Sequence, residues 1–151
     1  MIAHRATRSR TSGARPCAIL RAVNWNVAIK WVMLVSGALT CTMVYAAIAP
    51  REALRATFGE APEGPVAEIL ARNWGVLVTL VGASLIYGAF HPPARRLALM
   101  VALASKATFI ALVLSHGERF LGYQAGVAVV VDAVWVVLFA WYLASVRPAR
   151  V

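Results

Sequence analysis

Residues 97–115 read LALMVALASKATFIALVLS and contain a single charge, Lys106. Residues 121–146 read LGYQAGVAVVVDAVWVVLFAWYLASV and also contain a single charge, Asp132. An α-helix needs about 20 apolar residues to cross a bilayer, so each run is long enough. One charge at the centre of such a helix costs about 2.5–3.5 kcal/mol on insertion scales. Two opposite charges in neighbouring helices offset much of that cost by pairing, so the two runs predict both membrane helices and a shared polar centre.

The composition of the whole chain also indicates a membrane protein. Of its 151 residues, 61% are hydrophobic and 14% are charged, whereas an average soluble domain has about 25% charged residues. A soluble domain of this size would leave a large apolar surface facing water. The length predicts one domain.

Two further apolar runs precede those at 97–115 and 121–146. The sequence therefore predicts an all-α protein, a four-transmembrane-helix antiparallel bundle. The expected boundaries are a disordered basic tail at 1–22, a membrane domain at 23–146 with spans at about 27–49, 66–90, 97–115 and 121–146, and a short tail at 147–151. A short interfacial helix is expected at 51–58, between the first two spans.

The first span has an alternative interpretation as a signal peptide. The small-residue stretch Tyr45-Ala46-Ala47 resembles a cleavage site, although the apolar run is long for that role. Cleavage there would leave three spans and an N-terminus on the outer side.

The distribution of positive charge predicts the orientation of the bundle. With both termini cytoplasmic, ten Lys and Arg residues lie inside and four lie outside, as the positive-inside rule requires. The inner set includes six residues near the N-terminus: Arg5, Arg8, Arg10, Arg15, Arg21 and Lys30. This pattern predicts a multi-pass protein of a bacterial inner membrane.

The basic tail also bears on partners. Beside a membrane helix, such a tail is expected to contact anionic lipid. It has no interleaved aromatic residues and no binding fold, which argues against nucleic acid. The expected partners are therefore the lipid bilayer and either a membrane protein or further copies of this chain.

Lys106 and Asp132 lie at similar depths in adjacent helices. Lys106 is nine residues from Ser115 and Asp132 is eleven from Leu121, which places both roughly 14–17 Å below the outer surface. The pair has two interpretations: a buried ion pair that fixes the register of the helices, or a proton or ion relay. The sequence leaves both open and favours the structural one.

A second candidate polar site lies at the outer end of the second span, at Glu68, Arg72 and Asn73. Arg72 is placed to pair with Glu68 four residues earlier, or to bind an anionic headgroup. Asn73 would enter the interface and require a partner. The same span carries small residues at Gly75, Thr79 and Gly82, a spacing that permits close helix packing.

No motif for catalysis, a metal or a cofactor is found in the sequence. His91 and His116 are expected at opposite membrane surfaces, so one haem or metal cannot use both. Cys17 and Cys41, the only two cysteines, form no metal-spaced or redox-spaced pair. We therefore expect no enzyme activity and no cofactor.

Three short motifs carry a family resemblance: the Ala49-Pro50 stop, the segment Asn73-Trp74-Gly75 and Gly82. Over residues 27–145 the chain resembles the small DoxX-like bacterial membrane proteins and related uncharacterised four-helix families. The resemblance implies a four-helix fold. Some DoxX-like proteins are subunits linked to quinone or thiol oxidation, but no residue here matches a defined redox site. The sequence thus predicts a structural or accessory membrane subunit, with a small transporter or ion-translocating unit using Lys106 and Asp132 as the alternative.

Overall fold

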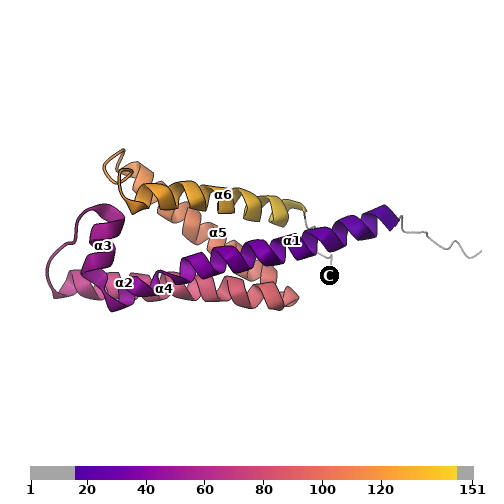
Figure 1. Cartoon of the computed structure of the whole chain (residues 1–151), viewed down its shortest axis with the longest axis horizontal. Helices are drawn as coiled ribbons and strands as arrows, with labels where there is room; N and C mark the ends of the chain where they lie inside the picture. The colour runs from indigo at the N-terminus through magenta and orange to yellow at the C-terminus, as the bar shows by residue number, and fades with distance from the viewer. Residues whose placement is uncertain (1–15, 146–151) are drawn as a thin grey trace, which may run out of the picture.

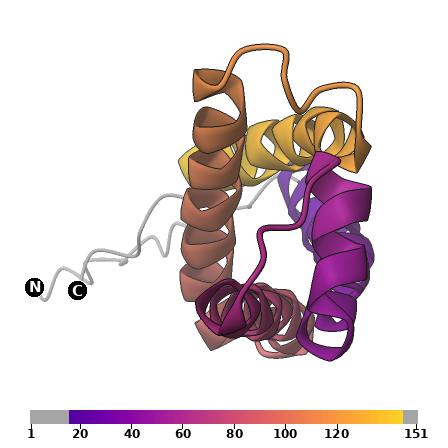
Figure 2. The same ribbon diagram turned by 90° about the vertical axis from the view of Figure 1, so that its left-hand side faces the viewer.

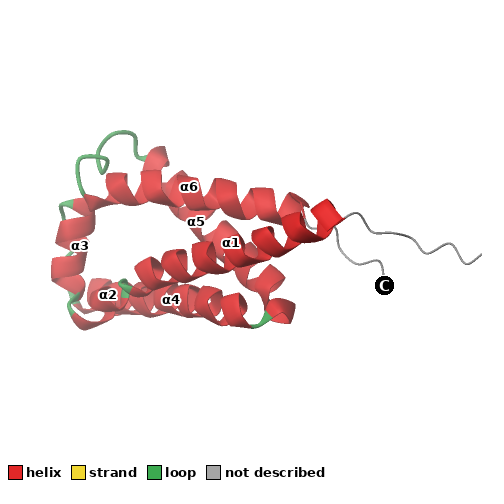
Figure 3. Cartoon of the chain, turned by 45° about the vertical axis from the view of Figure 1, so that its right-hand side comes forward, coloured by secondary structure: helices red, strands yellow, loops and turns green. Residues whose placement is uncertain are grey.

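The structure, a computed structural model, describes the backbone of residues 16–145 and the side chains of residues 25–145. These residues form helices joined by short turns, with no strand among them (Figures 1 and 3). The helices in chain order are α1 (Pro16–Cys41), α2 (Val44–Ile48), α3 (Pro50–Phe58), α4 (Pro65–Phe90), α5 (Pro92–Ser115) and α6 (Gln124–Ser145).

Four helical segments in this part of the chain are long and apolar enough to cross a membrane. They are Trp25–Ile48, Pro65–Phe90, Pro92–Ser115 and Gln124–Ser145. Large apolar side chains such as Leu80 and Val134 are exposed on their sides, which suits lipid better than water. Within residues 16–145, the prediction of an all-helical protein with four apolar spans is confirmed.

The start of α1 differs from the predicted domain boundary. Helix α1 begins at Pro16, so residues 16–22, for which we expected disorder, are helical. Proline is favourable at the first helical position, and Ala18-Ile19-Leu20 offers no helix breaker after it. The predictions for 1–15, for the end of the last span at 146 and for 147–151 lie outside the described residues.

The first span is not one continuous helix, because α1 ends at Cys41 and α2 starts at Val44. The backbone N–H groups of Thr42 and Met43 donate to carbonyls three residues earlier, at 3.2 Å each, which is the tighter 3₁₀ pattern. The Thr42 hydroxyl donates to Leu39 O at 2.7 Å and the Thr40 hydroxyl to Ser36 O at 2.8 Å. Hydrogen bonds from hydroxyl groups to the backbone compete with the backbone hydrogen bonds of a helix and bend it.

Helix α3 matches the short helix expected at 51–58. Pro50 occupies its first turn, and Gly59 ends it with φ 79°, a left-handed conformation that glycine adopts without strain. Figure 2 views the molecule from this end, where α3 crosses between α4 and α6. We call this end, with the last turn of α5, the α3 end.

Helix α4 packs closely against the first span through glycines. A Cβ added to Gly82 would lie 2.7 Å from Gly37 O, and one added to Gly75 would lie 2.7 Å from Ala47 N. The small residues predicted in the second span therefore do bring two helices into contact. In α6 the spacing Gly122-x-x-x-Gly126 does not act this way, because Gly122 precedes the helix and a Cβ there would face open space.

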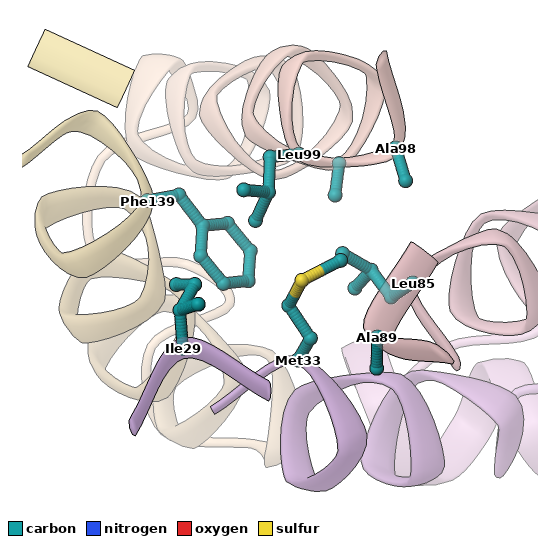
Figure 4. Packing of buried hydrophobic residues seen from close by; sticks show 8 residues of the cluster. Ile29, Met33, Leu85, Ala89, Ala98, Leu99 and Phe139 are labelled. Atoms are coloured by element: carbon teal, nitrogen blue, oxygen red, sulfur yellow. The ribbon is translucent and has the colours of Figure 1, made fainter. Parts of the chain in front are cut away.

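The main apolar core lies in the half of the molecule away from the α3 end. Figure 4 shows side chains from α1, α4, α5 and α6 converging there. Its largest fully buried members are Met33, Leu85, Leu99 and Phe139. A smaller cluster around Val113 and Val129 lies nearer the α3 end. Helix α5 runs diagonally between α4 and α6 (Figure 1) and contacts both.

Candidate functional site

The structure brings Lys106 and Asp132 together. Lys106 lies on α5 and Asp132 on α6, and Lys106 Nζ donates a hydrogen bond to Asp132 Oδ1. The two side chains are 8% and 17% exposed. The predicted contact between the two intramembrane charges is therefore confirmed, and it forms a buried salt bridge.

A third helix, α1, contributes Thr40 to this site, a residue that was not predicted from the sequence. Lys106 Nζ also donates to Thr40 Oγ1, at 3.3 Å. The Thr40 hydroxyl donates its own hydrogen bond to Ser36 O, so its oxygen can accept a hydrogen bond from the Lys106 ammonium. The polar centre thus links α1, α5 and α6.

All three members lie at one depth. Thr40 is eight residues before the end of α2, Lys106 nine before the end of α5, and Asp132 eight after the start of α6. At 1.5 Å per residue, each lies about 12–14 Å from the α3 end. The hydrocarbon core of a bilayer is about 30 Å thick, so helices that cross it with the α3 end at one surface would place the site near its middle.

One buried hydroxyl beside the site has no described partner. Ser36 is fully buried one helical turn before Thr40, and its Oγ makes no hydrogen bond to any of the described residues. Lys106 Nζ has three N–H groups, of which two have partners among those residues. The centre therefore retains hydrogen-bonding capacity that a small polar molecule such as water would satisfy.

The charge balance of the site determines what it can do. The ammonium of Lys106 and the carboxylate of Asp132 cancel, so the centre has no net charge to attract a lone ion. Neither the apolar cavity beside Phe58 and Trp74 nor the one beside Trp25 and Trp141 is lined by Lys106 or Asp132. The arrangement can hold three helices in one register, and it can move a proton only if the pair opens.

The other predicted polar site is only partly assembled. Arg72 Nε and Nη2 donate to Glu68 Oε1 at 3.1 and 2.7 Å, so the expected pair is present. Arg72 Nη1 also donates to Ala47 O at 2.5 Å, which ties α4 to α2. Asn73 is exposed, and none of the hydrogen bonds among the described residues joins its side chain to this pair.

The role of Arg95 was not predicted from the sequence, in which it counted only as an inner positive charge. Arg95 is 9% exposed. It donates to Gly88 O at 3.3 Å, to Ala89 O at 3.2 Å and to Asn26 Oδ1 at 3.4 Å. Carbonyls in the last turn of a helix have no partner within it. Arg95 therefore caps α4 and joins it to α1 at the end opposite α3.

Metal ligands do not gather in the part of the chain that the structure describes. No three His, Cys, Asp or Glu side chains there are placed to hold a metal ion. His91 directly follows α4, away from the α3 end, whereas His116 directly follows α5 at the α3 end. Cys41 is half-buried, and its Sγ lies 3.6 Å from Thr79 O.

Comparison of this chain with protein-family models, with curated proteins and with solved structures found no match.

Proposed function

We propose that this chain is an integral protein of the bacterial inner membrane that acts as a structural or accessory subunit and catalyses no reaction of its own. The four apolar helices support the membrane location. In this proposal the spans form an antiparallel bundle with both termini cytoplasmic. The excess of positive charge on the side of the termini supports that orientation.

The observation that carries the proposal is the closed polar contact among Lys106, Asp132 and Thr40. A buried ion pair adds little stability over an apolar core, and its best-attested use is to specify register and partner choice. Here it fixes α5 against α6 and α1 at one depth. Such a bundle offers a defined apolar exterior to a membrane partner or to further copies of the chain, with anionic lipid at the basic tail.

A second candidate function is proton or ion translocation through the same centre. The observation that favours it is that the Ser36 hydroxyl and one N–H group of Lys106 have no hydrogen-bond partner among the described residues. Intramembrane ionisable residues commonly mark proton and ion pathways. In this alternative the pair opens transiently and water enters between α1 and α6.

The test is a pair of single variants and their combination. Lys106→Met or Asp132→Leu alone leaves a buried charge without its partner, and such breaks typically cost about 3–5 kcal/mol. The double variant replaces both charges by apolar groups and should recover most of the loss in thermal unfolding. The exposed pair Arg119–Glu60 provides the matched control, and its removal should change stability little.

Vesicles loaded with a pH-sensitive dye separate the two functions. If the pair is structural, vesicles containing the wild-type protein and the double variant leak protons at the rate of protein-free vesicles. A proton flux that needs the wild-type pair, and that the stable double variant lacks, would replace the structural proposal by translocation. A loss of stability in the double variant equal to the sum of the two single losses would mean that Lys106 and Asp132 do not interact.

A further inference from the structure

A pocket of about 670 Å³ lies at the α3 end, apart from the Lys106–Asp132 centre. Three elements supply its walls, with Phe58 on α3, Leu70 on α4 and Leu112 on α5 among the lining residues. The ring of Phe58 lies 6.1 Å from that of Trp74 and 5.5 Å from that of Phe120. These aromatic contacts hold α3 against α4 and against the α5–α6 loop.

The pocket exists because α4 and α5 separate towards the α3 end. At the opposite end they meet tightly, since a Cβ added to Gly88 would lie 3.0 Å from Ala98 Cβ. From there α5 runs diagonally away from α4 (Figure 1). Along the widening gap, the α4 wall carries Ala67 and Ala71 four residues apart, a spacing that puts both on one face. Their small side chains leave the space unfilled.

The chemistry of the walls selects an apolar occupant. Apolar cavities in proteins stay dry and bind apolar molecules, and ligand pockets of about 300–1,000 Å³ are typical. On α4 the lining runs from Val66 to Trp74, which lie eight residue steps or about 12 Å apart along the helix. That is most of the roughly 15 Å depth of hydrocarbon in one leaflet of a bilayer about 30 Å thick. The pocket therefore has the depth of one acyl chain.

The rim of the pocket carries a charge that bears on the headgroup. Glu63, in the α3–α4 loop, lines the pocket, and it is in none of the ion pairs among the described residues. The neighbouring Glu60 is already paired with Arg119 at 2.6 Å. A free carboxylate at the mouth complements an ammonium group. We propose that this pocket binds an ethanolamine phospholipid of the adjacent leaflet, with one acyl chain between α3, α4 and α5 and the ammonium near Glu63.

Photolabelling of the full chain in vesicles tests this site. The vesicles consist of phosphatidylcholine with a tracer phosphatidylethanolamine that carries a diazirine near the end of its acyl chain. We expect label on peptides covering 66–74 and 109–113 that saturates with tracer and is displaced by unlabelled phosphatidylethanolamine. Label that rises in proportion to tracer, as expected on the exposed residues Val127, Val130 and Val134 of α6, would show ordinary boundary lipid and overturn the proposal. Displacement by oleic acid alone would show a fatty-acid site instead, which also overturns it.

Three variants locate the site. Ala67→Phe fills the pocket and should reduce the saturable label several-fold, whereas Ala83→Phe, on an exposed position of the same helix, should leave it unchanged. Glu63→Gln removes the charge in an exposed loop and should abolish the preference for the ethanolamine headgroup without unfolding the bundle. Unchanged labelling in both Ala67→Phe and Glu63→Gln would contradict the assignment, and the Glu63 variant gives this answer even if the filled pocket fails to fold.

Discussion

At the scale of single residues, the polar centre is held together by the hydrogen bonds that join Lys106, Asp132 and Thr40. Lys106 donates to both Asp132 and Thr40, and Thr40 donates onward to the carbonyl of Ser36. A hydrogen bond to a charged group contributes about 1.5–3 kcal/mol, more than one between neutral groups. Thr40 therefore matters more than a hydroxyl that only bonds to its own helix.

We expect Thr40→Val to lower the free energy of unfolding by about 1–3 kcal/mol, because it removes an acceptor from a buried ammonium while keeping the side-chain shape. Unfolding in mild detergent measures the change. Thr108→Val, at an exposed position on α5, is the control and should have little effect. In a protein that already carries Lys106→Met, Thr40→Val should lower the free energy of unfolding by less, because the effects of substitutions at two interacting residues do not add. Equal losses in both backgrounds would contradict the contact.

The sequence predicted the two charges of this centre but not its third member. Lys106 and Asp132 are conspicuous because each is the only charge in its apolar run. Thr40 carries no such signal, since hydroxyls inside spans usually bond back to their own helix, and Thr40 does that as well. Its depth, eight residues from the end of its span, was the available clue. Arg95 was missed for a related reason, because a charge at a membrane boundary is expected to face solvent.

At the scale of elements, the contact between α1 and α4 depends on the absence of side chains. Gly37 and Gly82 face each other, and a Cβ on either would lie under 3.0 Å from the backbone carbonyl oxygen of the other. In membranes, where lipid removes the hydrophobic drive between helices, such close backbone approach is a main source of packing energy. The small residues at Gly75 and Gly82 were predictable from spacing, whereas their partners on the first span were not.

Gly82→Ala should therefore destabilise the bundle by about 1–3 kcal/mol, the usual cost of overpacking. The added methyl group meets the backbone of Gly37 and Cys41, which cannot move as a side-chain end could. Gly122→Ala is the matched control, because a Cβ at that position meets nothing within 4 Å. Thermal unfolding of both variants in one detergent gives the comparison. If Gly122→Ala lowered stability as much as Gly82→Ala, close packing at Gly82 would not be the cause of the loss.

The positions of the long helices were predictable, but some of their ends and breaks were not. Hydropathy locates the spans because insertion into lipid requires long apolar runs. It does not detect the break after Cys41, since Thr42 and Met43 continue the apolar run and the break arises from local hydroxyl bonds. The short α3 was predictable because Pro50 and Gly59 mark its two ends.

At the scale of the whole molecule, the two ends of the bundle differ in charge. The α3 end holds the Arg119–Glu60 and Arg72–Glu68 ion pairs, in which positive charge is balanced locally. The opposite end carries Lys30, Arg95 and Arg96. Apart from Asp132 in the membrane centre, the described carboxylates lie on α3, at the start of α4 or in the two loops at the α3 end. The exposed Arg96 therefore has no carboxylate near it and is left to anionic lipid. This difference supports the proposed orientation, with the α3 end outside.

Reporter fusions test that orientation directly. Fusions after residues 60 and 118 fall in the two loops at the α3 end. The fusion after 93 falls at the start of α5, and the one after 150 near the C-terminus. We expect periplasmic activity at 60 and 118 and cytoplasmic activity at 93 and 150. The side with ten Lys and Arg residues should stay in the cytoplasm, whereas the side with four should be translocated. The inverted pattern would keep the four spans but place the acyl-chain pocket in the cytoplasmic leaflet. Periplasmic activity at 60 and 93 together would mean that α4 does not cross the membrane, and the polar centre would then lack the bilayer depth on which its role depends.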